Sequence, residues 1–101
     1  MKNIIISADG DRMVYSVPNA VADNLEKYCL EFRDNWIWTG PLAQKYRKGN
    51  GVCYNEKDFI EYLNNWIFPN EQSTLIENLG PTGIDAPPIP ERYSSCPSYN
   101  F

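Results

Sequence analysis

The fold is decided near the start of the chain by residues 4–17, which read Ile4-Ile5-Ile6-Ser7-Ala8-Asp9-Gly10-Asp11-Arg12-Met13-Val14-Tyr15-Ser16-Val17. Two apolar runs flank Asp9-Gly10, a dipeptide typical of the tight turn of a β-hairpin because it supplies the positive φ angles that such a turn needs. With this pair as the turn, Ile6 faces Met13 and Ile4 faces Tyr15, so these four side chains share one face. We expect that face to be the core face. If the turn has four residues instead of two, the same side chains remain on that face.

A long helix is predicted next, over about residues 18–37. Pro18 suits the first positions of a helix, where a missing N–H costs nothing, and Gly40-Pro41 cannot continue it. Apolar residues recur at three- and four-residue steps, as expected for a helix with one buried face. They are Val21, Leu25, Tyr28, Cys29, Phe32 and Trp36. Leu30 and Ile37 lie off this stripe and indicate that the helix has neighbours on a second side.

A second amphipathic helix is predicted over about residues 56–68. Asn55 and Asp58 have the spacing of a capping box, with Asp in place of the usual Glu or Gln. The Phe68-Pro69 dipeptide ends the helix, because the residue before a proline avoids helical geometry. Its apolar positions are Phe59, Tyr62, Leu63, Trp66 and Ile67.

The remaining segments are shorter. We predict a short helix over 42–48 that ends at Gly49-Asn50-Gly51, a possible third strand at 52–54, and a short helix over 71–79. Residues 81–101 are rich in Pro, Ser and Tyr, and we expect this tail to cross the core in an extended path. The sequence therefore predicts one α+β domain over residues 1–101, with a small antiparallel sheet built on hairpin strands at about 3–8 and 12–17.

Composition and charge exclude several classes of protein. Hydrophobic residues make up 43% of the 101 residues and charged residues 22%, which is ordinary for a globular domain and wrong for a disordered chain. The net charge of −4 argues against direct nucleic-acid binding, which needs Lys and Arg to neutralise phosphates. Lys45, Arg47 and Lys48 form the only basic island, and we interpret it as a solvated loop or helix end.

The chain contains no histidine and only three widely spaced cysteines. This composition predicts no zinc site, no histidine-dependent catalysis and no cofactor. The apolar run before Ser7 is too short for a signal peptide, and no stretch is long enough to span a membrane. We therefore expect a soluble cytoplasmic protein with free thiols. We expect Cys29 and Cys53 to be buried as small hydrophobic side chains, whereas Cys96 is predicted to be exposed and is a candidate reactive thiol.

Two groups of acidic residues were considered for catalysis. Glu26, Glu31 and Asp34 lie opposite the apolar stripe of the first helix, and Glu56, Asp58 and Glu61 lie opposite that of the second. General acid–base chemistry needs carboxyl groups whose pKa is shifted by burial or by a like charge. Solvated carboxylates lack this shift, so no catalytic residue is predicted.

The aromatic residues give the one positive indication of a functional surface. Trp36 and Trp38 lie about 200° apart on a helix, so both cannot belong to the buried stripe. Trp66 and Phe68 repeat this situation at the end of the second helix. Trp38, Trp66 and Phe68 are therefore the predicted partner-binding residues, since exposed aromatic side chains anchor protein interfaces. The alternative is that the C-terminal tail covers these rings.

Together these features predict a small, acidic, non-enzymatic protein that binds a macromolecular partner as an inhibitor, immunity protein or phage-type interaction protein. An acidic surface can also occupy a nucleic-acid-binding site by charge mimicry, if the carboxylates cluster on one face. The alternative function is a small-molecule or peptide-binding domain with a pocket between the hairpin, the helices and the tail. An enzyme that uses carboxylates or a thiol ranks third.

Overall fold

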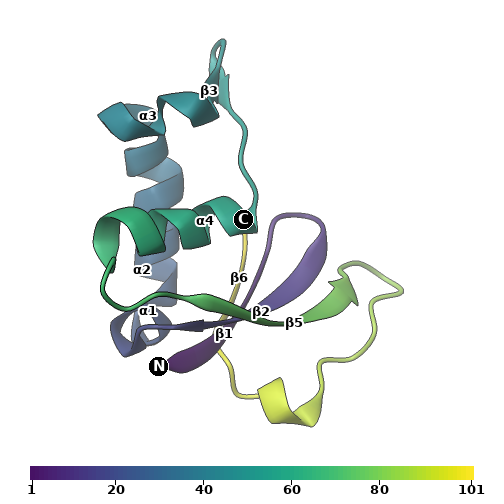
Figure 1. Ribbon diagram of the computed structural model, residues 1–101. Coiled ribbons are helices and arrows are strands. Elements are labelled where there is room, and N and C mark those ends of the chain that lie inside the picture. The colour runs from purple at the N-terminus through teal and green to yellow at the C-terminus, as the bar shows by residue number, and fades with distance from the viewer.

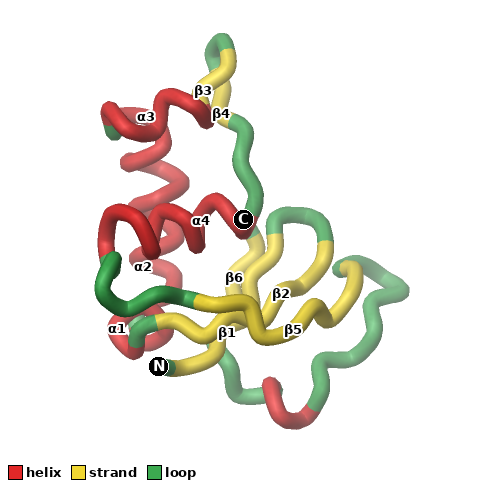
Figure 2. Tube along the Cα trace, in the orientation of Figure 1, coloured by secondary structure: helices red, strands yellow, loops and turns green.

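The computed structural model describes all residues 1–101 and has an α+β architecture, as predicted (Figure 1). A four-stranded sheet has the strand order β5-β2-β1-β6. Helices lie over one face of this sheet, and the C-terminal tail crosses below it in the view of Figure 2. The strands are β1 (Lys2–Ser7), β2 (Asp11–Val17), β5 (Thr74–Pro81) and β6 (Ser98–Asn100).

The N-terminal hairpin has the predicted register. Ile4 pairs with Tyr15 and Ile6 with Met13. Ile4 and Ile6 are fully buried, Tyr15 is nearly so, and Met13 is partly buried against the same core. The turn differs in detail, because Asp9 has a φ of 61° and Gly10 has no positive φ.

The third strand of the sheet is β5, not residues 52–54. A short helix had been predicted over 71–79, and that prediction is wrong. Strand β5 completes the backbone hydrogen bonding of β2 along its free edge. Its pairing skips Ile76, because Tyr15 faces Leu75 while Val14 faces Glu77. This bulge interrupts the two-residue alternation that identifies a strand in a sequence.

Residues 52–54 do not enter the main sheet. Strands β3 (Arg47–Lys48) and β4 (Gly51–Val52) pair only with each other. Gly49, with a φ of 58°, closes the turn between them, so the segment pairs locally. The resulting ribbon projects from the end of the molecule far from the sheet (Figure 1).

The fourth strand comes from the tail and makes the sheet mixed rather than purely antiparallel. Strand β6 runs parallel to β1, with Ile5 opposite Ser98 and Ser7 opposite Asn100. The tail reaches this edge only after crossing the far face of the sheet. A parallel partner requires such a crossover connection.

The helical segment predicted over 18–37 extends from Asn19 to Thr39, but Asn24, with a φ of −136° and a ψ of 40°, interrupts it, so it is not one helix. It comprises α1 (Asn19–Asp23), α2 (Leu25–Leu30), the π-helical η1 (Glu31–Trp36) and α3 (Ile37–Thr39). It ends at Gly40, where the backbone becomes extended before Pro41. Only glycine fits there, because a Cβ would lie 2.7 Å from the carbonyl oxygen of Trp36. The 3₁₀ helix η2 (Pro41–Tyr46) follows, where a short helix was predicted.

The second helix matches its prediction, with α4 (Glu56–Tyr62) continuing into the π-helical η3 (Leu63–Ile67). The capping box is present: the Asp58 N–H donates to Asn55 Oδ1 at 3.1 Å, and the Asn55 N–H donates to Asp58 Oδ2 at 2.9 Å. No helix in the chain combines the length and the apolar character needed to cross a membrane.

The two faces of the sheet are buried differently. On the helix face, a core of sixteen buried residues surrounds Phe32, which is fully buried. On the other face, Tyr93 of the short 3₁₀ helix η4 (Glu91–Tyr93) packs on Ile5 and Val14. This second cluster is small, so the tail covers its face of the sheet thinly.

Candidate functional site

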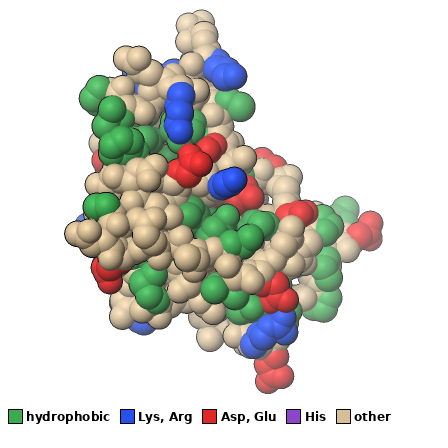
Figure 3. Space-filling view, viewed as in Figure 1, with side chains coloured by type: hydrophobic (Ala, Val, Ile, Leu, Met, Phe, Trp, Pro, Cys, Tyr) green, Lys and Arg blue, Asp and Glu red, His purple; other side chains and the backbone are tan.

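Trp38 and Trp66 lie at the ends of the two helices and remain exposed. The exposed fraction is 46% for Trp38 and 45% for Trp66. Leu42, on η2, and Ile67, next to Trp66, are also exposed. We call these four residues the aromatic end. Figure 3 shows hydrophobic side chains gathered over α3 and the region between α3 and α4.

The aromatic end is anchored in the core through Trp36. The Trp36 ring centroid lies 6.5 Å from that of Trp66 and 4.8 Å from that of Tyr62. Trp36 also packs on Phe32, at 5.9 Å. Because the inner rings are held on several sides, Trp66 is presented from a fixed base rather than from a loop.

Phe68 is placed differently from the two tryptophans. It is half-buried, and its ring lies 6.0 Å from that of Tyr28 on the first helix. Phe68 therefore packs between elements, and the exposed rings near the helix ends are those of Trp38 and Trp66. Leu42 and Ile67 were not predicted from the sequence as part of this surface. For Leu42 the sequence offers one indication of exposure, because it is an apolar residue in a short helix that has no complete apolar stripe.

The C-terminal tail does not cover Trp38 or Trp66. Its last residue, Phe101, packs into the core at 5.5 Å from Phe59 and 5.9 Å from Phe32. The preceding tail residues lie on the far face of the sheet, where Tyr93 is buried. The packed residues of the tail thus lie elsewhere, and the two indoles keep their exposure.

The basic island borders the aromatic end. Lys45, on η2, lies 5.0 Å from the Tyr46 ring centroid and 3.6 Å from a carboxylate oxygen of Glu61. Arg47 donates to the carbonyl of Gly40, and Lys48 is exposed on β3. Figure 3 shows Lys and Arg side chains beside the hydrophobic patch.

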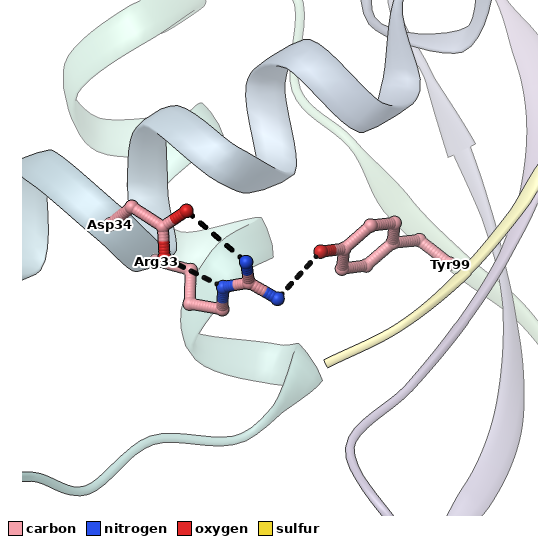
Figure 4. A network of polar contacts seen from close by, with 3 residues as sticks. All are labelled: Arg33, Asp34 and Tyr99. Carbon is pink, nitrogen blue, oxygen red and sulfur yellow. Dashed lines mark hydrogen bonds and ion pairs between the residues drawn. The ribbon is translucent and has the colours of Figure 1, made fainter.

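A polar network joins the tail to the first helix (Figure 4). Arg33 Nε and Nη2 donate to the two carboxylate oxygens of Asp34 at 2.8 and 3.1 Å, and Nη1 donates to the Tyr99 hydroxyl at 2.8 Å. The hydrogen bonding from Arg33 lowers the pKa of Asp34. Because this moves the pKa of Asp34 further from neutral pH, the network suits attachment of β6 rather than proton transfer.

Of the six acidic residues considered for catalysis, those on the first helix are exposed and those on the second, Glu56, Asp58 and Glu61, are partly buried. Glu26, Glu31 and Asp34 border a shallow depression on the outer face of the first helix, beside the half-buried Leu30. Ile37, the other residue off the stripe, is fully buried. No group of three or more Cys, Asp or Glu side chains lies close enough together to hold a metal ion.

The three thiols differ in accessibility. Cys29 is buried as predicted, and burial raises the pKa of its thiol to about 12. Cys53 is exposed, so its predicted burial is wrong; the cause is that its segment lies outside the main sheet. Cys96 is partly covered, because it packs against the cluster of Ile5, Val14 and Tyr93.

Comparisons with protein-family models, curated proteins and solved structures found no significant match. The chemistry offered by the aromatic end is apolar contact from indole and aliphatic side chains, with lysines at the border.

Proposed function

We propose that this protein acts without catalysis, by binding a protein partner through the aromatic end. The observation that carries the proposal is the half-exposure of Trp38 and Trp66 on a surface whose inner rings are fixed by the core. Tryptophan is among the residues that contribute most to binding energy at interfaces. A pre-ordered anchor also loses little conformational entropy when it binds.

The neighbouring charges favour a partner with carboxylates around an apolar centre. Lys48 has no ion pair, and Lys45 has only one long contact, to Glu61. Both can face acidic side chains at the rim of an interface, where charge contributes to association rate and specificity. An inhibitor, an immunity protein or a phage-type interaction protein is consistent with such a surface.

Two other modes of binding have less support. The two surface cavities are lined by other residues, so neither Trp38 nor Trp66 borders a pocket for a small molecule. Addition of a partner strand to β5 is disfavoured by the bulge at Ile76, by Gly80 with a φ of 87°, and by Pro81 at the strand end.

The proposal is tested by affinity capture from the native cell lysate with a matched control. Trp38→Ala combined with Trp66→Ala should lose the captured protein. Leu75→Ala combined with Ile76→Ala should retain it, although these side chains on β5 are as exposed as the two indoles. Equal capture by both double variants would contradict the proposed surface.

A second copy of the chain is the other possible occupant, and sedimentation equilibrium of the purified protein separates the two. We expect a monomer over the micromolar range. If the protein self-associates and Trp38→Ala abolishes this self-association, the partner at the aromatic end is a second copy of the chain and not a different protein.

A further inference from the structure

A second site lies on the opposite side of the molecule, between the sheet and the tail. It is a cavity of about 180 Å³ that takes its lining from three strands and the tail. Ser7 on β1 and Ser98 and Asn100 on β6 form part of it, and Arg12 on β2 lies beside them. Thr82 and Ile89 of the tail supply the outer wall. None of the lining residues is acidic.

Arg12 brings an uncompensated charge to this cavity. Its guanidinium makes no ion pair, and its one protein partner is the backbone carbonyl of Pro87, to which Nη2 donates. The Nε atom is buried and has no acceptor. The adjacent Asp11 is engaged by the side-chain amide of Asn78 at 2.9 Å. A partly buried cation without a carboxylate favours an anion nearby.

Two other side chains of the cavity, Asn100 and Ser98, keep a free donor, whereas the Ser7 and Thr82 hydroxyls already donate within the chain. The Ser7 hydroxyl donates to Asn100 Oδ1 at 3.0 Å, and the Asp9 N–H donates to the same oxygen at 3.2 Å. With its oxygen occupied twice, Asn100 has its Nδ2 amide group free to donate. The hydroxyl of Ser98 likewise makes no hydrogen bond within the chain.

We propose that this cavity binds a carboxylate group, supplied by a small organic acid or by an acidic side chain of a bound protein. The planar guanidinium of Arg12 matches the geometry of a carboxylate. The Asn100 amide group and the Ser98 hydroxyl supply the remaining hydrogen bonds to it. The volume is below that of pockets for drug-sized ligands and suits a group of a few atoms. Ile89 provides apolar contact for an attached methylene chain. This site is independent of the aromatic end.

The test is a ¹H–¹⁵N NMR titration of the full chain with sodium succinate at pH 7, at constant ionic strength adjusted with sodium chloride. We expect saturable shifts centred on Ser7, Thr82 and Asn100, with a dissociation constant on the order of 1 mM. The Arg12 Nε–H resonance should shift with them. The absence of saturation, or the same shifts with chloride alone, would overturn the proposal.

Two arginine variants provide a matched pair. Arg12→Gln should weaken succinate binding about tenfold or more, the usual effect of losing a charged hydrogen-bond donor. Arg47→Gln is the control, because Arg47 also donates to a backbone carbonyl and also has a buried Nε without an acceptor, yet borders no cavity. If Arg12→Gln impairs folding, the titration of the wild type still tests the proposal, because chemical-shift changes located away from the cavity would contradict binding at this site.

Two further ligands identify the source of the group. A capped tripeptide with a central glutamate, binding more tightly than succinate, would assign the carboxylate to a protein partner. The reverse order would assign it to a free organic acid. Inorganic phosphate that binds while both carboxylates fail would overturn the assignment. The cavity does not include Trp38 or Trp66, so a titration without binding at the cavity would not contradict the proposed function of the aromatic end.

Discussion

The two faces of the sheet are covered in unlike ways. On the helix face, the Phe32 ring has six aromatic neighbours, and helices and tail contribute to the same core. On the tail face, Tyr93 covers Ile5 and Val14 with support from Leu79 and Cys96. The tail therefore covers the sheet and fills the core with Phe101, while Trp38 and Trp66 at the helix ends keep nearly half of their surface exposed.

This division also predicts unequal stability. Elements with few buried apolar contacts open locally at a lower free energy than those in the main core. We therefore expect the tail face to open separately and the helix face to open only on global unfolding.

Removal of the central ring should have the largest effect. Phe32→Ala should lower the free energy of unfolding by about 3–5 kcal/mol, because the ring is fully buried and its loss leaves a cavity. Urea denaturation followed by circular dichroism measures the change. Trp38→Ala should cost clearly less in the same assay, because nearly half of that ring is exposed. Comparable costs would mean that the core is not centred on Phe32.

Tyr93→Ala tests the thinner face. We expect a loss of about 1–3 kcal/mol in the free energy of unfolding, because the ring is buried among few neighbours. Hydrogen exchange should become faster in β6 and in the tail while protection of the first helix persists. A loss as large as that of Phe32→Ala, with uniform exchange, would remove the distinction between the faces.

The reaction rates of Cys29 and Cys96 report on local opening of the helix face and of the tail face in the same molecule. At pH 8, a disulfide reagent should modify exposed Cys53 first and Cys96 next. Cys29 should react at least about a hundredfold more slowly than Cys96, since it needs global opening and only the thiolate attacks. Burial acts in the same direction, because it raises the pKa of Cys29 to about 12 and leaves almost no thiolate. Mass spectrometry of quenched samples resolves the order, and simultaneous reaction of Cys29 and Cys96 would contradict it.

The smallest effect concerns the ion pair that attaches η4 to β5. Arg92 Nη2 contacts both carboxylate oxygens of Glu77, at 2.7 and 2.8 Å. The Tyr93 hydroxyl, followed by Arg92, lowers the pKa of Glu77 below its usual 4.5. A lowered pKa contributes stability above pH 4.5, and this contribution disappears as the pH falls through the folded-state value.

Glu77→Gln should therefore melt at a slightly lower temperature than the wild type at pH 7, and the gap should narrow as the pH falls below 4.5 through the lowered pKa of Glu77. Glu91→Gln is the control, since Glu91 is exposed and forms no ion pair. A gap that is constant from pH 7 to pH 3 would show that the carboxylate charge is not involved.

The parts of the fold that could be predicted are those determined by neighbouring residues. The hairpin register follows from Asp9-Gly10, and the capping box follows from Asn55 and Asp58. Strand β5 could not be identified, because its bulge at Ile76 removes the alternation. The parallel pairing of β6 depends on the whole path of the tail, which no local pattern encodes.

The same limit applies to the candidate sites. The position of Trp38 off the buried stripe follows from the phase of one helix, and the structure leaves this side chain exposed. The partner of Phe68, Tyr28, comes from the other helix, so its partial burial had no local signal. The Arg12 cavity draws on residues as far apart in the chain as Ile5 and Asn100 and could only be found in three dimensions.

The most direct test of the account is the solvent accessibility of the three indole N–H groups in the free protein. A soluble paramagnetic agent broadens the ¹H–¹⁵N signals of exposed indoles in proportion to their accessibility. We predict strong broadening for Trp38 and Trp66 and weak broadening for Trp36, both in the full chain and in Tyr93→Ala. Equal protection of all three indoles would contradict the claim that the tail leaves the aromatic end open to a partner.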